Sequence, residues 1–466
     1  MSYTPTNYTA VHGFMQMLRY QNNYPALGTG TLILSIQGHN LLGDYLPQVM
    51  LDYTTQFQFN LFGGYPLKKD IVPSAIFTAA FGVIFLLHLT IFLINVSRQH
   101  YFWISIGWIF YSMMRIIGWV LRITWSSQLA NARMGISAEV FLIMPTILLV
   151  SLNLMLAARI FTWRHPVGGS RRLFWNTMLL LYFIVLGLVA MTIVCAASPY
   201  VYFLSLDNYI RFQKGVQASS ILIILYSLTA VALLMLAYFF PTTKKDDNFY
   251  TYQPWWIESF SPFYFVAKGA KEEAEESFMK RVSNHRHAVR VIAATHHNYN
   301  MVQGLTTQRG SLKHNVSLMI IVVTTILIFI PAILRAIVMF EGRFNMYGSR
   351  LTDPVVMYIF WGLCEVIINA LYIIGRVDLR FYRPDRLPKR VRNIITAEQS
   401  LHNTPDNQSL VSMDASILSG EKPVRHSGAR YTTTDDDELS HSSDFVFDGH
   451  TMDTESPPYP SDEFKF

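Results

Sequence analysis

The sequence predicts an all-α protein: a seven-helix transmembrane bundle with its N-terminus outside the membrane and its C-terminus in the cytosol. Three observations lead to this prediction. Of the 466 residues, 51% are hydrophobic and only 15% are charged, whereas a soluble domain has roughly 25% charged residues. Seven stretches are long and apolar enough to cross a bilayer, which takes about 20 residues of helix. Lys and Arg gather in alternate connections between these stretches.

Seven predicted spans of 22 to 25 residues account for the apolar content. They cover residues 71–95, 101–123, 137–160, 173–197, 216–240, 316–340 and 354–375. Each is about twice as long as an average soluble helix of roughly 11–12 residues. The first span begins near Ile71, too far along the chain for a cleaved signal peptide, so we expect it to act as an uncleaved anchor. Residues 71–240 thus hold five spans, and residues 316–375 hold two.

Positive charge between the spans predicts the orientation, because cytosolic connections are enriched in Lys and Arg. Residues 161–172 hold three such residues, residues 241–315 hold ten, and the basic juxtamembrane segment 376–395 holds seven. The opposite connections hold at most two each, although Lys68 and Lys69 beside the first span argue the other way. We therefore expect a multi-pass protein of the plasma membrane or an endomembrane.

The N-terminal segment 1–70 is expected on the outer side. It is rich in aromatic residues and nearly uncharged, and short apolar runs such as Thr31 to Ile36 indicate strands or packed turns. Asn7 begins an Asn-Tyr-Thr sequence, which is a glycosylation acceptor on an extracytosolic segment. The sequence therefore predicts a glycoprotein modified at Asn7.

The long cytosolic connection 241–315 has two parts. Nine aromatic residues fall within 249–265. Since Trp and Tyr favour the headgroup region, one interpretation is a segment lying on the inner leaflet, and the other is a docking surface for a partner. Within 266–298, Phe278, Val282 and Val289 recur on one stripe, which predicts an amphipathic helix.

The tail 396–466 differs from the rest of the chain. It holds four Lys or Arg against fourteen Asp or Glu, a net charge of −10, and it lacks hydrophobic periodicity, so we expect a disordered acidic cytosolic tail. The basic remainder does not indicate nucleic acid as a partner, because no RNA or DNA motif accompanies its charge. We expect membrane lipids as partners, with anionic headgroups at the cytosolic face and a cytosolic protein on the loop or tail as further candidates.

Polar side chains inside predicted spans are the first candidate site, because burying them in a membrane is costly. They are His88, Arg115, Arg122, Glu139, Asn153, Arg335, Glu365 and Asn369. The two asparagines are expected to form hydrogen bonds between helices.

The charged members of this set can be paired by depth. Arg115 and Arg122 are seven residues apart and share one face of the second span. Arg115 and Glu365 both lie at mid-depth, whereas Arg122 and Glu139 lie near the outer ends of their spans. We therefore pair Arg115 with Glu365 and Arg122 with Glu139. Structural ion pairs are one interpretation, and a ligand or proton pathway through the bundle is the other.

Several chemistries find no support in the sequence. Residues 354–375 contain no lysine for a retinal Schiff base, and no His-Glu-x-x-His zinc motif occurs. The two cysteines, Cys195 and Cys364, exclude a disulfide framework and a thiolate zinc site. No nucleophile, base and orienting group can be assembled, so we expect no catalytic residue, no cofactor and no metal, and an enzyme is the least favoured class.

A set of short motifs carries a family resemblance. They are His88, Phe92, Asn95, Arg98 and His100; Arg115-Ile116 and Leu121-Arg122-Ile123; Asn153-Leu154, Ala157, Arg159 and His165-Pro166; and Glu365-Val366, Arg376-Val377-Asp378, Arg380-Phe381 and Pro384-Asp385. Over about 71–240 and 316–390 the chain resembles a fungal family of integral membrane proteins that bears only a domain-of-unknown-function label. The resemblance implies a seven-helix fold and a fungal setting, but no activity. The connection 241–315 is longer than the resemblance leads us to expect.

Many of these motif residues cluster at the predicted cytosolic face and form the second candidate site. They are Arg98, His100, Arg159, His165, Pro166, Arg376, Asp378 and Arg380. One interpretation is that they anchor a rigid scaffold to headgroups. The other is a site that binds anionic lipid or couples to a cytosolic partner.

The layout favours a receptor-like or sensor protein that couples an outer or intramembrane signal to the cytosolic face. The signatures of rhodopsin-like receptors are absent, because the third span ends in Ala157-Ala158-Arg159-Ile160 and the seventh lacks an Asn-Pro-x-x-Tyr sequence. The alternative is a carrier or scramblase for lipids or small solutes, which the buried charges and the in-span prolines Pro145 and Pro331 also suit.

Overall fold

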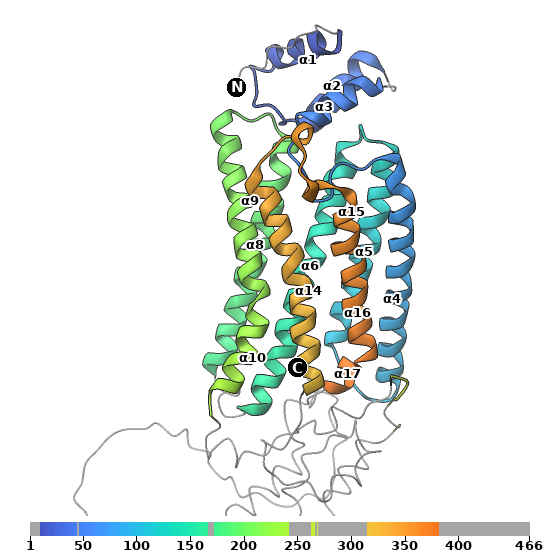
Figure 1. Ribbon diagram of the computed structural model, residues 1–466, viewed down its shortest axis with the longest axis vertical. Helices are drawn as coiled ribbons and strands as arrows, with labels where there is room; N and C mark the ends of the chain where they lie inside the picture. The colour runs from blue at the N-terminus through green and yellow to red at the C-terminus, as the bar shows by residue number, and fades with distance from the viewer. Residues whose placement is uncertain are drawn as a thin grey trace, which may run out of the picture. The chain divides into compact units, whose positions relative to one another are not determined.

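The computed structural model describes residues 10–43, 46–165, 172–241, 262–265, 268 and 315–381. Within these ranges, seven helices are long and apolar enough to cross a membrane, and they lie side by side as a bundle (Figure 1). The predicted seven-helix architecture is confirmed, and the chain is a polytopic membrane protein. Which side of a membrane each end faces stays a prediction, so the two ends are named below by their elements, as the α1–α3 end and the α17 end.

The seven predicted spans all coincide with helices, which extend a few residues beyond most of the apolar runs. The first four are α4 (Ile71–Ser97), α5 (Ile104–Ser127), α6 (Ala132–Arg164) and α8 (Arg172–Val201). The fifth is α9 (Leu206–Ser227) followed by α10 (Thr229–Phe239), and the sixth is α14 (Asn315–Glu341). The seventh consists of α15 (Pro354–Met357), a π-helical stretch η6 (Tyr358–Leu363) and α16 (Cys364–Ile374).

Helix α6 is the centre of the bundle. It contacts α5, α8, α9, α10 and α14, and its side chains supply many of the fully buried residues of the core, including Leu142, Leu149 and Leu156. Its start is capped by Asn131, whose side chain accepts a hydrogen bond from the amide of Met134 (3.3 Å), which satisfies one free donor of the first turn. The last span packs on α14 and α4.

Three short helices precede the bundle: α1 (Ala10–Gln21), α2 (Thr31–Leu42) and α3 (Gln48–Gln56). The expectation of strands or packed turns at Thr31 to Ile36 is therefore wrong, because this run begins α2. A short apolar run cannot by itself distinguish a helix from a strand. The packing decides, since α2 lies against α6 and α8 and Ser35 donates a hydrogen bond to the carbonyl of Ala130 (2.7 Å).

The loops at the α1–α3 end are joined by backbone hydrogen bonds. Asn60 donates to Arg343 (3.0 Å) and Asn345 donates to Gln58 (2.8 Å), around a bridge between Phe59 and Phe344. Short helical turns follow on both sides, namely η1 (Lys68–Asp70), η4 (Asn345–Tyr347) and η5 (Arg350–Thr352). The segment before the first span is thereby fixed to the loop before the last span.

Helix α17 (Val377–Arg380) ends the described chain at the opposite end of the bundle (Figure 1). Several predictions lie outside the described residues. They are the glycosylation at Asn7, the role of Pro166, residues 249–261 of the aromatic segment, the amphipathic helix over 266–298 apart from Lys268, and the segments 382–395 and 396–466.

Candidate functional site

A cavity of about 190 Å³ lies at the α1–α3 end, between these short helices and the ends of α5, α6, α8, α9 and α14. A single water needs about 10–15 Å³ on the same measure, so the cavity is an order of magnitude larger than a site for one water. Its wall is largely apolar, with Met15, Leu18 and Met50 from α1 and α3 on one side and Trp125 and Trp361 on others. We call this space the outer-end pocket, a name taken from the predicted topology.

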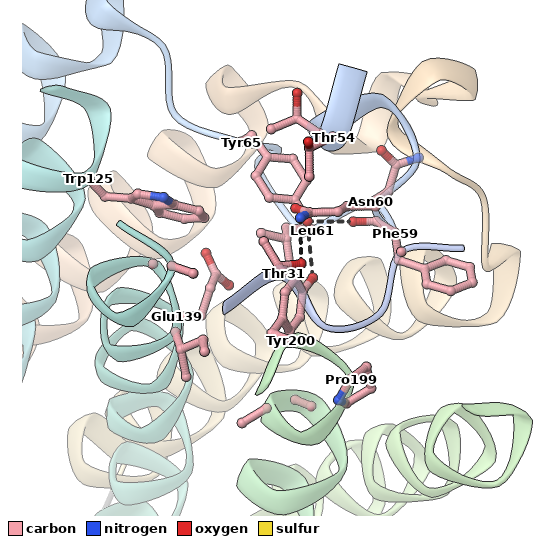
Figure 2. A pocket seen from close by; sticks show the side chains of 18 of the residues that line it. Thr31, Thr54, Phe59, Asn60, Leu61, Tyr65, Trp125, Glu139, Pro199 and Tyr200 are labelled. Atoms are coloured by element: carbon pink, nitrogen blue, oxygen red, sulfur yellow. Dashed lines mark hydrogen bonds between the residues drawn. The ribbon is translucent and has the colours of Figure 1, made fainter. Parts of the chain in front are cut away.

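The polar side chains of the outer-end pocket come from several elements. Figure 2 shows Glu139 of α6 and Tyr200 of α8 beside the same space as Tyr65 and Trp125. The hydroxyls of Tyr65 and Tyr200 are hydrogen-bonded to each other (3.1 Å), and Tyr65 also bonds the carbonyl of Phe59 (3.2 Å). Burial raises the pKa of the Tyr65 hydroxyl well above its usual value, so this group stays neutral and acts as a hydrogen-bonding wall.

Arg122 joins three elements beside the pocket. Its guanidinium lies 3.8 Å from a carboxylate oxygen of Glu139, which confirms the pairing predicted from depth, and 3.7 Å from a carboxylate oxygen of Asp70. It also donates to the carbonyls of Gly63 (2.9 Å) and Gly64 (3.2 Å). Both glycines have a positive φ, a conformation that glycine adopts at little cost.

Arg335 of α14 also lines the outer-end pocket and is only 6% exposed. No hydrogen bond or salt bridge joins it to any described residue, although it lies close enough to Glu139 for their opposite charges to interact. Glu139 in turn has one buried carboxylate oxygen, Oε1, with no hydrogen-bond donor among the described residues. The pocket therefore contains both an unmatched set of donors and an unmatched acceptor.

The centre of the bundle contains a saturated ion pair. Arg115 and Glu365 are both buried and form a two-pronged salt bridge, with Nε of Arg115 donating to Oε2 (2.5 Å) and Nη2 donating to Oε1. Tyr111 donates to the same carboxylate, and Arg115 also donates to Leu142 O (2.7 Å) and the hydroxyl of Thr146 (3.0 Å). The pairing predicted from depth is confirmed, and its remaining polar atoms have partners.

A second polar layer lies one turn further along the last span. Asn369 donates to the carbonyl of Glu365 (2.7 Å), and its side-chain oxygen accepts from Nε2 of His88 on α4 (3.3 Å). Tyr372 donates to Asn153 (2.5 Å), which donates to the hydroxyl of Thr324 on α14 (3.0 Å). Both asparagines therefore form the hydrogen bonds between helices that the sequence predicts.

At the α17 end, Asp378 is the centre of a buried cluster. Arg376 donates to its two carboxylate oxygens (3.0 and 2.7 Å), and Asn95 of α4 donates to one of them (2.8 Å). Nε2 of His100 donates to the backbone carbonyl of Asp378 (2.9 Å). We call these four residues, Arg376, Asp378, Asn95 and His100, the α17-end cluster.

The electrostatics of the α17-end cluster favour one protonation state. Burial raises the pKa of Asp378, but the hydrogen bonds and charge of Arg376, together with Asn95, outweigh it, so the pKa lies below its ordinary value. Burial lowers the pKa of His100 to about 4. The carboxylate is thus charged and the imidazole neutral near pH 7, so Arg376 balances the charge of Asp378 within the cluster.

Residues 262–265 of the long connection rest on this cluster. Arg376 donates to the carbonyls of Pro262 (3.2 Å) and Tyr264, while Arg98 donates to the carbonyl of Phe265 (3.3 Å). The Arg376 guanidinium lies 4.6 Å from the centroid of the Phe265 ring. Arg376 makes these contacts with a left-handed backbone, at φ 47°, which costs a non-glycine residue about 1–3 kcal/mol.

The other motif residues at this end have different neighbours. His165 is buried and donates from Nε2 to the carbonyl of Ala237 on α10 (2.8 Å), and the charge of Arg159 acts on Tyr182 of α8. Arg380 donates from Nε to the carbonyl of Gly375 (2.5 Å). The structure therefore gathers His100, Arg376, Asp378 and Arg380 just beyond the last span, and it places Arg98 on Phe265. Arg159 and His165 lie against α8 and α10.

Sequence reasoning missed several members of the outer-end pocket. Asp70 was visible as an acidic residue at the start of the first span, which is a signal for a partner of a buried arginine. Tyr65, Tyr200 and Asn60 carried no comparable signal, because tyrosine and asparagine are common at membrane edges and in loops.

Comparison with known proteins finds a family match over part of the chain and no activity. Residues 166–382 match the family described as "Protein of unknown function (DUF3112)". No curated protein and no solved structure matches the chain. The matched range includes Arg335, Glu365 and Arg376 but not α4, α5 or Glu139. The resemblance over 71–165 and the fungal setting therefore stay predictions.

Proposed function

We propose that this polytopic membrane protein is a receptor-like sensor that couples occupancy of the outer-end pocket to the state of the α17 end. The observation that supports this most is the course of the last span. Its residues Trp361, Glu365, Asn369 and Tyr372 are spaced by three or four and so lie on one side of the span. Arg376 follows shortly after the end of the span at Ile374. Trp361 lines the pocket, and Arg376 belongs to the α17-end cluster.

Each residue on that face contacts a different part of the bundle. Glu365 binds Arg115 of α5, Asn369 binds His88 of α4, and Tyr372 binds Asn153 of α6. A shift or rotation of the last span therefore changes polar contacts along its whole length. Because Trp361 belongs to the π-helical stretch η6, and π-helical turns often occur at functional sites, the pocket end of this span is a suitable place for such a change to begin.

The readout lies in the long connection. Arg376 and Arg98 hold residues 262–265 through backbone carbonyls and the Phe265 ring. If a ligand binds one position of the last span better than another, it shifts the population toward that position and tightens or releases this segment. On the predicted topology, the pocket faces outward and the segment faces the cytosol.

Hydrogen–deuterium exchange tests this proposal without knowledge of the ligand. The purified full chain in phosphatidylcholine nanodiscs is exposed to laurate, dodecanol or dodecylamine, which share a chain and differ in head group. Any probe that binds is expected to change exchange at residues 262–265 and 376–381. Asn369→Leu, which breaks the contact between α16 and α4, is expected to leave binding intact and reduce that change. Binding with no change in exchange at the α17 end would contradict the proposal.

A carrier or scramblase is the second candidate, and one observation favours it. Buried polar groups occur at every level of the bundle, from Arg122 through Glu365 and Asn369 to Asp378. Most of these groups are saturated by one another, which favours a sensor over a path for a solute. Liposomes containing the pure protein decide between the two, because a carrier produces lipid or solute flux above that of protein-free liposomes.

A further inference from the structure

We infer that the outer-end pocket binds a single-chain amphiphile with an anionic head group, of which a carboxylate is the simplest, and that Arg335 holds this head group. The inference rests on the proposed function only in taking the pocket as the ligand site. It adds the chemical class of the ligand and the residue that selects it.

Arg335 is buried, and its guanidinium has no hydrogen-bond acceptor among the described residues. A guanidinium carries five N–H donors, yet no described residue accepts a hydrogen bond from Arg335, whose exposed fraction is 6%. Buried charges in a membrane protein are normally paired. At the centre of the same bundle, Arg115 makes the two-pronged contact to Glu365 that guanidinium and carboxylate groups favour. An anionic head group would complete the same arrangement at Arg335.

The charged groups that line the pocket indicate the sign of the ligand's charge. Glu139, the acidic group that lines the pocket beside Arg335, already has Arg122 at 3.8 Å. Arg335 has no acceptor within salt-bridge distance among the residues that the structure describes. Glu139 therefore already has a cation beside it, whereas Arg335 has no anion within salt-bridge distance in the described chain. A ligand that completes the pocket is thus expected to carry a negative charge. Oε1 of Glu139, the atom that faces Arg122, is buried and has no hydrogen-bond donor among the described residues.

The apolar wall of the pocket indicates that the rest of the ligand is a hydrocarbon chain. The pocket wall contributed by the short helices is apolar, and Met15, Leu18 and Met50 pack there as a small hydrophobic cluster of their own. Trp125 adds an aromatic surface. A pocket lined mainly by apolar groups with a few placed polar ones is typical of sites for amphiphilic small molecules. The head group is recognised at Arg335, and the chain is buried without specific contacts.

Equilibrium binding of radiolabelled laurate to the full chain in phosphatidylcholine nanodiscs tests the inference. Empty nanodiscs provide the background. Unlabelled laurate is expected to compete at least ten times better than dodecanol or dodecylamine. Arg335→Gln, which keeps the length and removes the charge, is expected to weaken laurate binding at least tenfold and to leave dodecanol unaffected.

Matched variants distinguish the loss of the contact between Arg335 and the head group from a general loss of folded structure. Arg133→Gln removes an exposed arginine near the start of α6 and is expected to change laurate binding less than twofold. Arg335→Lys keeps a positive charge and is expected to bind laurate better than Arg335→Gln does. Glu139→Gln removes the competing carboxylate and is expected to strengthen laurate binding. The elution volume and unfolding temperature of each variant show that it is folded.

The source of the head group is distinguished by lipid composition. In nanodiscs containing phosphatidylglycerol, weaker laurate binding by the natural chain but not by Arg335→Gln would identify an anionic membrane lipid as the occupant. Unchanged laurate binding would identify a free acid. If the affinity depends neither on the head group of the probe nor on Arg335, the inference is wrong, but the pocket remains a ligand site. Absence of binding by all three probes would overturn the pocket in both proposals.

Discussion

The buried charged groups at the two ends of the bundle differ in whether they have hydrogen-bonding partners within the described chain. At the α17 end, Asp378 has donors from Arg376 and Asn95 on its carboxylate, and His100 binds its backbone. At the α1–α3 end, Arg335 has no hydrogen bond to a described residue, and the Oε1 atom of Glu139 has no donor there. The Asp378 carboxylate therefore has its donors within the chain, although Oδ1 of Asn95 beside it lacks a donor in the described part of the chain. The Arg335 guanidinium has no acceptor among the described residues.

This difference shows which buried charges hold the structure together. A buried polar group without a partner costs about 1–3 kcal/mol or more, and natural folds rarely retain it without a reason. The Asp378 carboxylate and the Arg115–Glu365 pair meet this requirement internally, so we expect their disruption to destabilise the fold. The unmatched groups at Arg335 and Glu139 are expected to contribute to ligand binding and little to stability.

The largest effect is expected from separating Arg115 and Glu365. Arg115→Leu or Glu365→Leu leaves one buried charge without its partner, which typically costs about 3–5 kcal/mol. The double variant removes both charges and is expected to recover more than half of that loss. Unfolding in mixed detergent micelles measures all three variants, and simply additive losses would show that the pair acts as two independent residues.

The next effect is a loss of stability at acid pH that depends on His100. In the unfolded chain His100 binds a proton below about pH 6.5. In the folded protein it binds one only below about pH 4, because burial lowers its pKa. Stability is therefore present above pH 6.5 and falls as the pH drops from 6.5 to 4, by about 3 kcal/mol for the full shift.

Unfolding of the natural chain and of His100→Gln across this pH range measures that loss. The variant is expected to show a flatter profile, since it has no imidazole to protonate at this site. His39→Gln on α2 is the matched control and is expected to follow the natural chain. Parallel profiles for the natural chain and His100→Gln would show that His100 does not resist protonation in the fold.

A smaller effect is expected from Asn95→Ala at the α17 end. The variant removes one donor from the Asp378 carboxylate and keeps Arg376, so it is expected to cost about 1.5–3 kcal/mol, the range for a hydrogen bond to a charged group. The same unfolding assay measures the loss. A variant as stable as the natural chain would show that Arg376 alone satisfies the carboxylate, and the contrast between the two ends would weaken.

The smallest effect is expected from Arg335→Leu. The variant loses no hydrogen bond to a described residue and removes a buried charge, so stability is expected to stay the same or to rise by up to about 1 kcal/mol. Unfolding without any added amphiphile is the decisive measurement. A loss above about 2 kcal/mol would mean that Arg335 has a structural partner, and the two ends would then be alike.

Much of the fold could be predicted because its signal is local. Each of the seven apolar runs is long enough to require a membrane-spanning helix. The pairs Arg115–Glu365 and Arg122–Glu139 followed from depth, since a buried charge needs a partner at its own level. Depth could not reveal that Asp70 also lies 3.7 Å from Arg122, because Asp70 is at the membrane edge, where a carboxylate can also face water.

The number of spans, the polar residues inside them and the pairing of Arg115 with Glu365 and of Arg122 with Glu139 follow from the amino-acid sequence alone. The packing of distant segments was needed to show that Thr31 to Ile36 begins a helix and that residues 262–265 rest on Arg376. It also showed that Arg335 has no hydrogen-bonding partner among the described residues. The physical reason is range. Hydrophobicity and helix formation act within a segment, whereas a pocket and an unmatched charge depend on which side chains distant segments bring together, and no single segment encodes that.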